Sequence, residues 1–204
     1  MNPVLAGKEI NMKEKVKLVL VIDASGSMQS TQIETVTAVE NLIKEHRELE
    51  GKKVHLQIYT FDNVVRELVP TTKLKKYNNE FSSLYTTGGL TALYDAISRA
   101  VDENKENTKY AKTSLIILTD GAENSSQKFN EKDVSERLTH VQDNLGWDVT
   151  YLGAKREDFE NHTFSLGIKK GKSIQFNPDA VGQRSASLTS ATTLSTSYFS
   201  GTGF

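Results

Sequence analysis

Two kinds of hydrophobic pattern alternate along the chain after its first fifteen residues. Nearly continuous apolar runs occupy 16–22 and 114–119, as expected for strands that a mostly parallel sheet buries on both faces. Other segments carry apolar residues at three- and four-residue spacing, which predicts amphipathic helices over 30–49, 91–104 and 131–145. Predicted strands therefore alternate with predicted helices.

A hairpin is predicted after the first helix. Residues 54–61 form a β-rich run in which apolar and polar side chains alternate at first, and Asp62 and Asn63 then mark a turn into a second strand over 64–68. This pair is predicted to be antiparallel and to place one edge strand on the sheet. Residues 70–89 show little periodicity and are predicted as a loop with at most one short helical turn.

In the C-terminal third the predicted strands and the first predicted helix are short. Strands are predicted over 147–152 and 172–176, with a short helix over 156–159 between them. From residue 179 the spacing is helical, but Ser and Thr, which are weak helix formers, crowd the segment after Ser185. Residues 200–204 are expected to be disordered in isolation.

The helical spacing also predicts which side chains face the core. For the first helix these are Ile33, Val36, Val39, Leu42 and Ile43. For the third helix they are Val134, Leu138, Val141 and Leu145, with Asn130 as the N-cap.

These elements predict a doubly wound α/β domain, with a mostly parallel central sheet, one antiparallel edge strand and helices on both faces. The predicted organisation is an N-terminal extension over 1–15, the α/β domain over 16–178 and a Ser/Thr-rich C-terminal segment over 179–204.

The composition of the chain excludes several classes of function and of site. The 204 residues carry a formal net charge of −1, so no overall field favours nucleic acid or an anionic membrane. The chain has no cysteine, which excludes disulfides, thiolate zinc sites and cysteine nucleophiles. The longest apolar run, 18–22, is too short to span a bilayer, and residues 1–16 lack the continuous apolar core of a signal peptide. A cytoplasmic protein is therefore expected.

Candidate chemistry lies after the buried strands, because ligand sites in such sheets form at the carboxyl ends of the strands. Asp23, Ser25 and Ser27 follow the first strand, and Asp120 follows the strand over 114–119. Ser25 and Ser27 are two residues apart in a turn, so both hydroxyls can point the same way, while Gly26 gives the backbone freedom to bend. A hard cation such as Mg²⁺ prefers oxygen ligands of this kind.

The Asp-x-Ser-x-Ser segment at 23–27, Thr91 in a Gly-rich loop before a helix, and Asp120 after a central strand occur in the order of a known motif. Together they resemble the metal-ion-dependent adhesion site (MIDAS) of von Willebrand factor A-type domains, in particular intracellular bacterial and phage members, and the resemblance covers about 16–152. It implies a non-catalytic, metal-dependent module that binds a protein partner.

The resemblance also implies roles for the site residues. Ser25, Ser27 and Thr91 would touch a bound Mg²⁺, with Mn²⁺ or Ca²⁺ as other candidates. Asp23 and Asp120 would hold coordinating waters or the serine hydroxyls. An Asp or Glu of the partner would supply the last ligand. Neither the partner nor the oligomeric state follows from the sequence.

Other interpretations stay open at this stage. Asp23 and Ser25 could simply cap the following helix. A Mg²⁺-dependent phosphohydrolase would need a second acid where Ser25 stands. Glu123, Asn124 and Ser125 could line a partner surface or form a plain loop. The histidines, which are His46, His55, His140 and His162, are expected at exposed or half-buried positions.

A further alternative concerns biological context. Many intracellular members of the resembled family work as accessory subunits of AAA-type ATPases or belong to stress-resistance systems of the tellurite type. The small size of the chain and the absence of a signal-peptide pattern favour this setting over extracellular adhesion.

Overall fold

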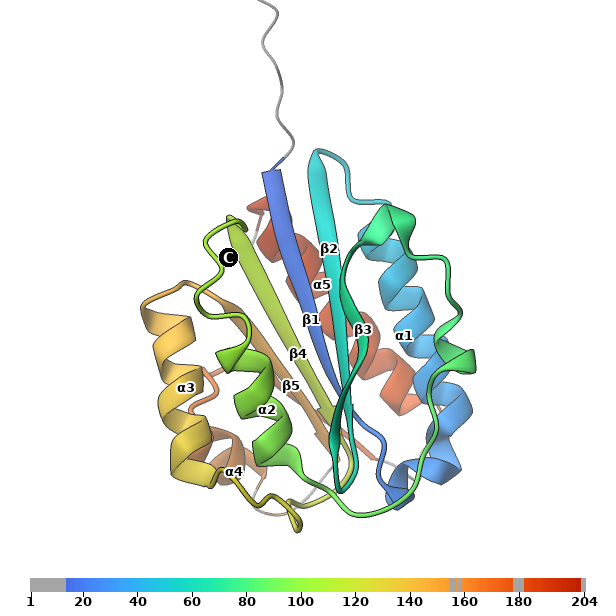
Figure 1. Ribbon diagram of the computed structural model, residues 1–204, viewed down its shortest axis with the longest axis vertical. Helices are drawn as coiled ribbons and strands as arrows, with labels where there is room; N and C mark the ends of the chain where they lie inside the picture. The colour runs from blue at the N-terminus through green and yellow to red at the C-terminus, as the bar shows by residue number, and fades with distance from the viewer. Residues whose placement is uncertain (1–13, 155–156, 158, 178–181, 203–204) are drawn as a thin grey trace, which may run out of the picture.

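A computed structural model describes residues 14–154, 157, 159–177 and 182–202. It contains a six-stranded sheet in the order β3-β2-β1-β4-β5-β6 (Figure 1). The strands are β1 (Glu14–Asp23), β2 (Lys52–Phe61), β3 (Val65–Lys73), β4 (Lys112–Thr119), β5 (Asp148–Ala154) and β6 (Ser173–Phe176). Neighbouring strands are parallel except β2 and β3. The predicted mostly parallel sheet with one antiparallel edge strand is confirmed.

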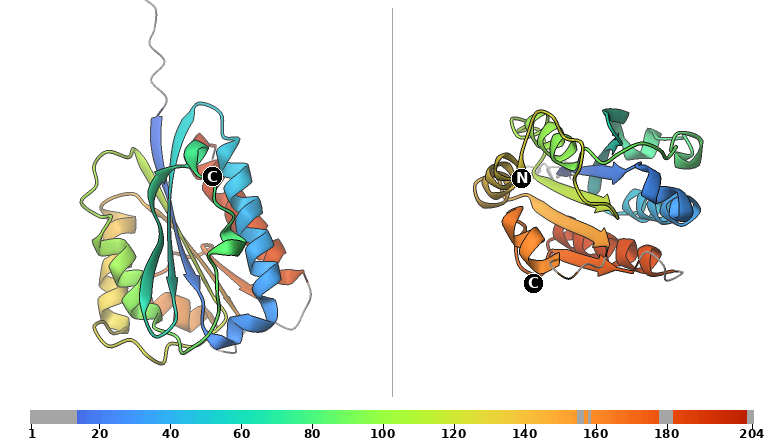
Figure 2. Two further views of the ribbon diagram at one scale, coloured as in Figure 1. Left: turned by 45° about the vertical axis from the view of Figure 1, so that its right-hand side comes forward. Right: turned by 90° about the horizontal axis from the view of Figure 1, so that it is seen from below.

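Helices cover both faces of the sheet (Figure 2). They are α1 (Gln32–Arg47), α2 (Leu93–Asp102), α3 (Glu131–Asp143), α4 (Phe159–Ser165) and α5 (Gln183–Ser200), with short 3-10 turns η1 (Gly26–Thr31), η2 (Leu74–Lys76) and η3 (Phe81–Ser83). Helices α1 and α5 contact each other on one face, and α2 and α3 do so on the other. Within the described residues, no helix has the length and apolar character needed to cross a membrane.

The central strand β1 shows why the apolar run at 16–22 is continuous. Successive side chains of a strand point to opposite faces. Leu18 and Leu20 join the core beneath α1 and α5, whereas Val19 and Val21 join the core beneath α2 and α3. Both sets are buried, so β1 is apolar on both faces.

Two side chains predicted to face the core are exposed. Ile33 is 85% exposed, because the buried side of α1 is centred on residues such as Val39 and Leu42, and helical rotation carries position 33 well away from them. Leu145 is 43% exposed, because α3 ends at Asp143 and position 145 no longer follows the helical repeat. The predicted N-cap is confirmed, since Asn130 forms a capping box.

The loop predicted over 70–89 is wrong in its first part, because β3 continues to Lys73, and the rest contains two short helical turns, η2 and η3, where at most one was predicted. Strand β3 lies at the edge of the sheet and can include Pro70, which has no N–H to donate to a further strand. The predicted short helix over 156–159 instead begins at Phe159, and residues 156 and 158 lie outside the described residues.

The Ser/Thr-rich segment forms a full helix, α5, which contacts α1 and the sheet. The expected disorder is wrong for Ser200 and Gly201, which are the last residue and the C-cap of this helix. Its buried apolar side chains include Leu188, Ala191 and Phe199. This burial offsets the weak helix propensity of Ser and Thr. The predicted domain limits at 15 and 178 stay predictions; residues 1–13 and 178–181 lie outside the described residues.

His46 contradicts the expectation that the histidines are exposed or half-buried, because its side chain is fully buried between α1 and α5. Its Nδ1 atom lies 2.8 Å from the Leu42 carbonyl oxygen and its Nε2 atom lies 2.7 Å from Ser195 Oγ. A carbonyl oxygen only accepts, so Nδ1 carries the proton and Nε2 accepts from Ser195. The neutral ring therefore links the two helices.

Candidate metal centre

The predicted site residues lie on loops at one edge of the sheet. Strands β1 and β4 are adjacent and parallel, so Asp23, at the end of β1, and Asp120, directly after β4, lie at the same carboxyl edge. The loop that carries Thr91 leads into α2 at this edge, the lower end of the molecule in Figure 1. Three segments that are distant in sequence therefore meet here.

Hydrogen bonds connect four of the five predicted residues. The backbone N–H of Ser25 donates to Asp23 Oδ1 over 2.7 Å. The hydroxyl oxygens of Ser25 and Ser27 are 3.0 Å apart, and Ser27 Oγ donates to Asp120 Oδ1 over 2.6 Å. Thr119, the last residue of β4, donates its hydroxyl to Asp23 Oδ2 over 2.5 Å. The serine hydroxyls do point the same way.

The position of Gly121 shows that Thr91 belongs to the same cluster. A Cβ atom built on Gly121 would lie 3.0 Å from Thr91 Oγ1 and 3.6 Å from both Asp23 Oδ2 and Ser27 Oγ. Three side-chain oxygens from three loops therefore surround one small volume. A glycine at position 121 keeps this volume free of side-chain carbon.

Backbone contacts hold these loops together. Gly26 N–H donates to Gly89 O over 3.0 Å, and Gly88 N–H donates to Ala24 O over 2.8 Å. The φ of Gly26 is not positive, and a Cβ there would make an ordinary contact of 3.4 Å with Gly89 O, so the observed conformation does not require a glycine at this position. Gly89 itself has φ of +78°, and a side chain there would collide with Asn63 Oδ1.

Two residues that position the site were not predicted to hold it. Asn124 accepts from Thr91 N–H through Oδ1 over 2.8 Å, and its own N–H donates to Thr91 O over 3.1 Å. Tyr85 donates its hydroxyl to Asp23 O over 2.6 Å. Glu123 accepts from the N–H groups of Tyr94, Ser125 and Ser126. The loop over 123–125 therefore holds the loop that carries Thr91 in place.

The cluster is buried on one side and open on the other. Asp23, Ser25 and Thr91 are at most 3% exposed, whereas Ser27 is exposed and Asp120 is partly exposed. Burial raises the pKa of Asp23, although hydrogen bonds from Thr119 and Ser25 oppose this rise. A ligand approaching from solvent would meet Ser27 and Asp120 first.

The donor set suits a hard cation. Among the described residues, no group of three or more His, Asp or Glu could hold a metal ion by itself, so the cluster differs from a carboxylate or imidazole site. Its oxygens are hydroxyls and carboxylates, which suit Mg²⁺ rather than a soft metal. The capping interpretation is not supported, because Ser25 occupies the N-cap of η1 without a side-chain capping hydrogen bond.

Replacing Gly121 with alanine should block this volume. The new methyl group would lie 3.0 Å from Thr91 Oγ1, which is closer than ordinary contact. We expect the folded state to persist and the response of the melting temperature to Mg²⁺ to fall or vanish, measured by thermal unfolding with and without the ion. Gly88→Ala is the matched control, since a Cβ there meets nothing within 4 Å. An undiminished response in Gly121→Ala would contradict a ligand in this volume.

Comparison with known proteins identifies the family of the fold. A model of the von Willebrand factor type A domain family matches residues 17–184. Comparison with curated protein sequences gives no match.

Solved structures share the fold. The vWF domain of the type V pili tip protein Mfa5 from Porphyromonas gingivalis is 12% identical with a TM-score of 0.64, and the match covers 89% of this chain and 95% of that one. Proximal thread matrix protein 1 from the mussel byssus, in a structure with a zinc-occupied MIDAS motif, is 16% identical with a TM-score of 0.61, covering 90% and 46%. The chain thus spans about half the length of the mussel protein. At these identities the likeness concerns the fold alone.

Proposed function

The chain belongs to the von Willebrand factor type A domain family, and from this premise we propose that it is a metal-dependent protein-binding module. In this proposal Ser25, Ser27 and Thr91 ligate one divalent cation, and Asp23 and Asp120 hold coordinating waters or orient the serine hydroxyls. Mg²⁺ is the proposed ion, with Mn²⁺ or Ca²⁺ as other candidates. Domains of this family often mediate protein–protein interaction.

The observation that carries the proposal is the small volume beside Gly121, with oxygens of Thr91, Asp23 and Ser27 around it. Neighbouring ligands of an octahedral Mg²⁺ ion are about 3 Å apart, given metal–oxygen distances near 2.1 Å. The Ser25 and Ser27 hydroxyl oxygens are 3.0 Å apart. The donor types and their spacing therefore both fit a small hard ion.

The charge of the proposed ligands supports a role in binding. Hydroxyl ligands are neutral, so a bound divalent cation would supply positive charge for a carboxylate of a partner protein. Ser27 and Asp120 lie at the solvent side of the cluster, where that carboxylate would arrive. We therefore propose an Asp or Glu of a protein partner as the group that is bound.

We propose that the module is not an enzyme. Ser25 stands where a phosphohydrolase of similar fold would need its second acid. The hydroxyl of Ser25 lies beside Ser27, whose own hydroxyl donates to Asp120, and the described residues place no histidine in this hydrogen-bonded chain. A serine nucleophile would need such a base.

The test measures metal binding and partner binding together. Mg²⁺ should raise the melting temperature of the chain, because a ligand of the folded state adds about 2.7 kcal/mol at roughly a hundredfold excess over Kd. Ser27→Ala and Asp23→Asn should lose this response. Ser27 is exposed, so its replacement should leave the fold intact. A partner captured in Mg²⁺ should be released by EDTA.

The control is Ser83→Ala, which removes an exposed serine hydroxyl from η3, outside the site. It should keep both the metal response and the partner. A metal response that persists in Ser27→Ala and Asp23→Asn would contradict the ligand assignment. Turnover of a phosphate ester that Asp23→Asn abolishes would contradict the binding role and assign a hydrolase instead.

The cytoplasmic location remains a prediction. The absence of cysteine from the chain fits a reducing compartment. Mfa5, which shares the fold, is a pilus tip protein, so the fold does not determine the compartment.

A further inference from the structure

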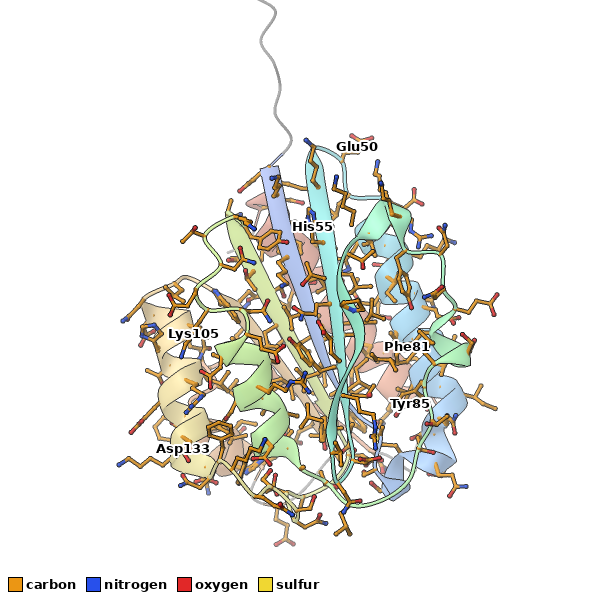
Figure 3. All side chains as sticks on the ribbon, in the orientation of Figure 1. Glu50, His55, Phe81, Tyr85, Lys105 and Asp133 are labelled. Atoms are coloured by element: carbon orange, nitrogen blue, oxygen red, sulfur yellow. The ribbon has the colours of Figure 1, made fainter. Side chains whose placement is uncertain are left out.

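A second feature lies at the opposite end of the sheet from the candidate metal centre. A cavity of about 340 Å³ opens beside the amino ends of β1 and β2, the end of β3 and the last turn of α1. Figure 3 labels His55, one of its lining residues, near the amino end of β2. The volume is within the range of small-molecule sites in proteins.

The lining of this cavity, here called the basic pocket, is rich in cations. They are Lys15, Arg47, Lys52, Lys53, Lys73 and Lys75, and among the residues that the structure describes no Asp or Glu lines the pocket. His46, Val54, His55 and Leu74 complete the wall. The whole chain has a formal net charge of only −1, so this concentration of positive charge is local.

Strand register places several of these cations side by side. Lys15 of β1 lies directly opposite Lys53 of β2, and His55 of β2 lies directly opposite Lys73 of β3. Lys17 lies opposite His55. Lys15 and Lys53 are like charges at opposed positions, and such a pair costs folding free energy unless an anion compensates it.

Carboxylates within the protein neutralise little of this charge. Lys52 forms an ion pair with Glu14. For Lys15, Lys53, Lys73 and Lys75, the described part of the chain shows no ion pair within hydrogen-bonding or salt-bridge distance. The lowered pKa of His55, caused first by burial and then by Lys73, Lys15 and Lys17, is consistent with cations gathered around this ring.

Protection of a sheet edge explains only part of the pattern. Lysines on an edge strand discourage pairing with another chain, and β3 is an edge strand. That reason covers Lys73. It also covers Lys53, because the pairing of β2 with β3 begins only at His55. It does not cover Lys15, which lies between Lys53 of β2 and the Ala111 N–H that donates to Lys15 O.

We propose that the basic pocket binds an oligophosphate, either free or as part of a nucleotide. Several adjacent lysines can contact a chain of phosphates, whereas one phosphate would neutralise only part of the charge. Val54 and Leu74 are only 8% and 1% exposed, so the contacts of the lysines with phosphate carry the proposed binding. This site is separate from the metal centre and does not depend on its function.

Isothermal titration calorimetry of the full chain with inorganic tripolyphosphate and with ATP tests this proposal. EDTA is present throughout, so the candidate metal centre cannot contribute. We expect saturable binding that weakens about tenfold in the double variant Lys53→Gln/Lys73→Gln, because it removes two of the cations of the pocket. Lys132→Gln, at an exposed position on α3, is the matched control and should bind as the parent does.

The possible outcomes distinguish a nucleotide from a free oligophosphate, and a specific site from diffuse electrostatic attraction. Tighter binding of ATP than of tripolyphosphate assigns a nucleotide, and equal or weaker binding of ATP assigns a free oligophosphate. No saturable binding of either would overturn the proposal, as would equal loss in the Lys132→Gln control, which would indicate diffuse attraction. Binding of a single-stranded oligonucleotide without binding of tripolyphosphate or ATP would also overturn it.

Discussion

Replacing Phe199 with alanine is expected to lower the free energy of unfolding by about 3–5 kcal/mol, the usual cost of removing a buried aromatic side chain. Phe199 is fully buried in α5 and belongs to the same core as Leu18 and Leu20. Its ring also lies 5.9 Å from the ring of His46 in an edge-on arrangement. The substitution would leave a cavity between α5 and α1.

Urea unfolding of Phe199→Ala and of the parent chain measures this effect. Thr193→Ala is the matched control on the same helix, because Thr193 is exposed and its replacement should change stability by no more than about 0.5 kcal/mol. A loss below about 1 kcal/mol in Phe199→Ala would contradict the packing of α5 described here.

The second large effect is a loss of stability in acid that depends on His46. Burial lowers the pKa of His46 to about 4 in the folded protein, from an ordinary value of 6.5. Because the folded state favours the neutral ring, this stability is present above pH 6.5 and is lost as the pH falls toward 4. The shift corresponds to roughly 3 kcal/mol. The protonated ring could no longer accept from Ser195 through Nε2.

Unfolding free energies measured between pH 7 and pH 4 test this expectation. The parent should lose stability steeply across this range, while His46→Gln should be less stable at pH 7 and show a shallower dependence. The exposed His140, replaced in His140→Gln, serves as the control and should keep the parent slope. Equal slopes for the parent and His46→Gln would rule out His46 as the source.

The candidate site was predictable because the sequence features that mark it involve residues close together in the chain. Asp23, Ser25 and Ser27 lie within five residues, and each strand that leads into the site ends at a polar residue. Parallel strands bring their carboxyl ends to one edge, so Asp120 had to lie near that edge once the alternation of strands and helices was read. Asn124 and Tyr85 were not predictable, because their contacts with Thr91 and Asp23 depend on the paths of two loops.

Local sequence patterns did not predict the full length of helix α5 or the burial of His46. Ser and Thr have weak helix propensity, yet α5 forms because Leu188 and Phe199 are buried against the rest of the domain. His46 follows the buried side of α1 one turn after Leu42, but its partner Ser195 lies 149 residues away. Nothing near either residue in the sequence indicates that the two would meet.

The sequence by itself therefore determined the α/β class, the mostly parallel sheet and the set of polar residues at its carboxyl edge, because hydrophobic period and strand ends are properties of neighbouring residues. Only the tertiary structure decided the burial of His46, the docking of α5 and the basic pocket. Lys15, Lys53 and Lys73 come from three strands, and their proximity follows from strand order and register. Those depend on long-range packing, which no local pattern encodes.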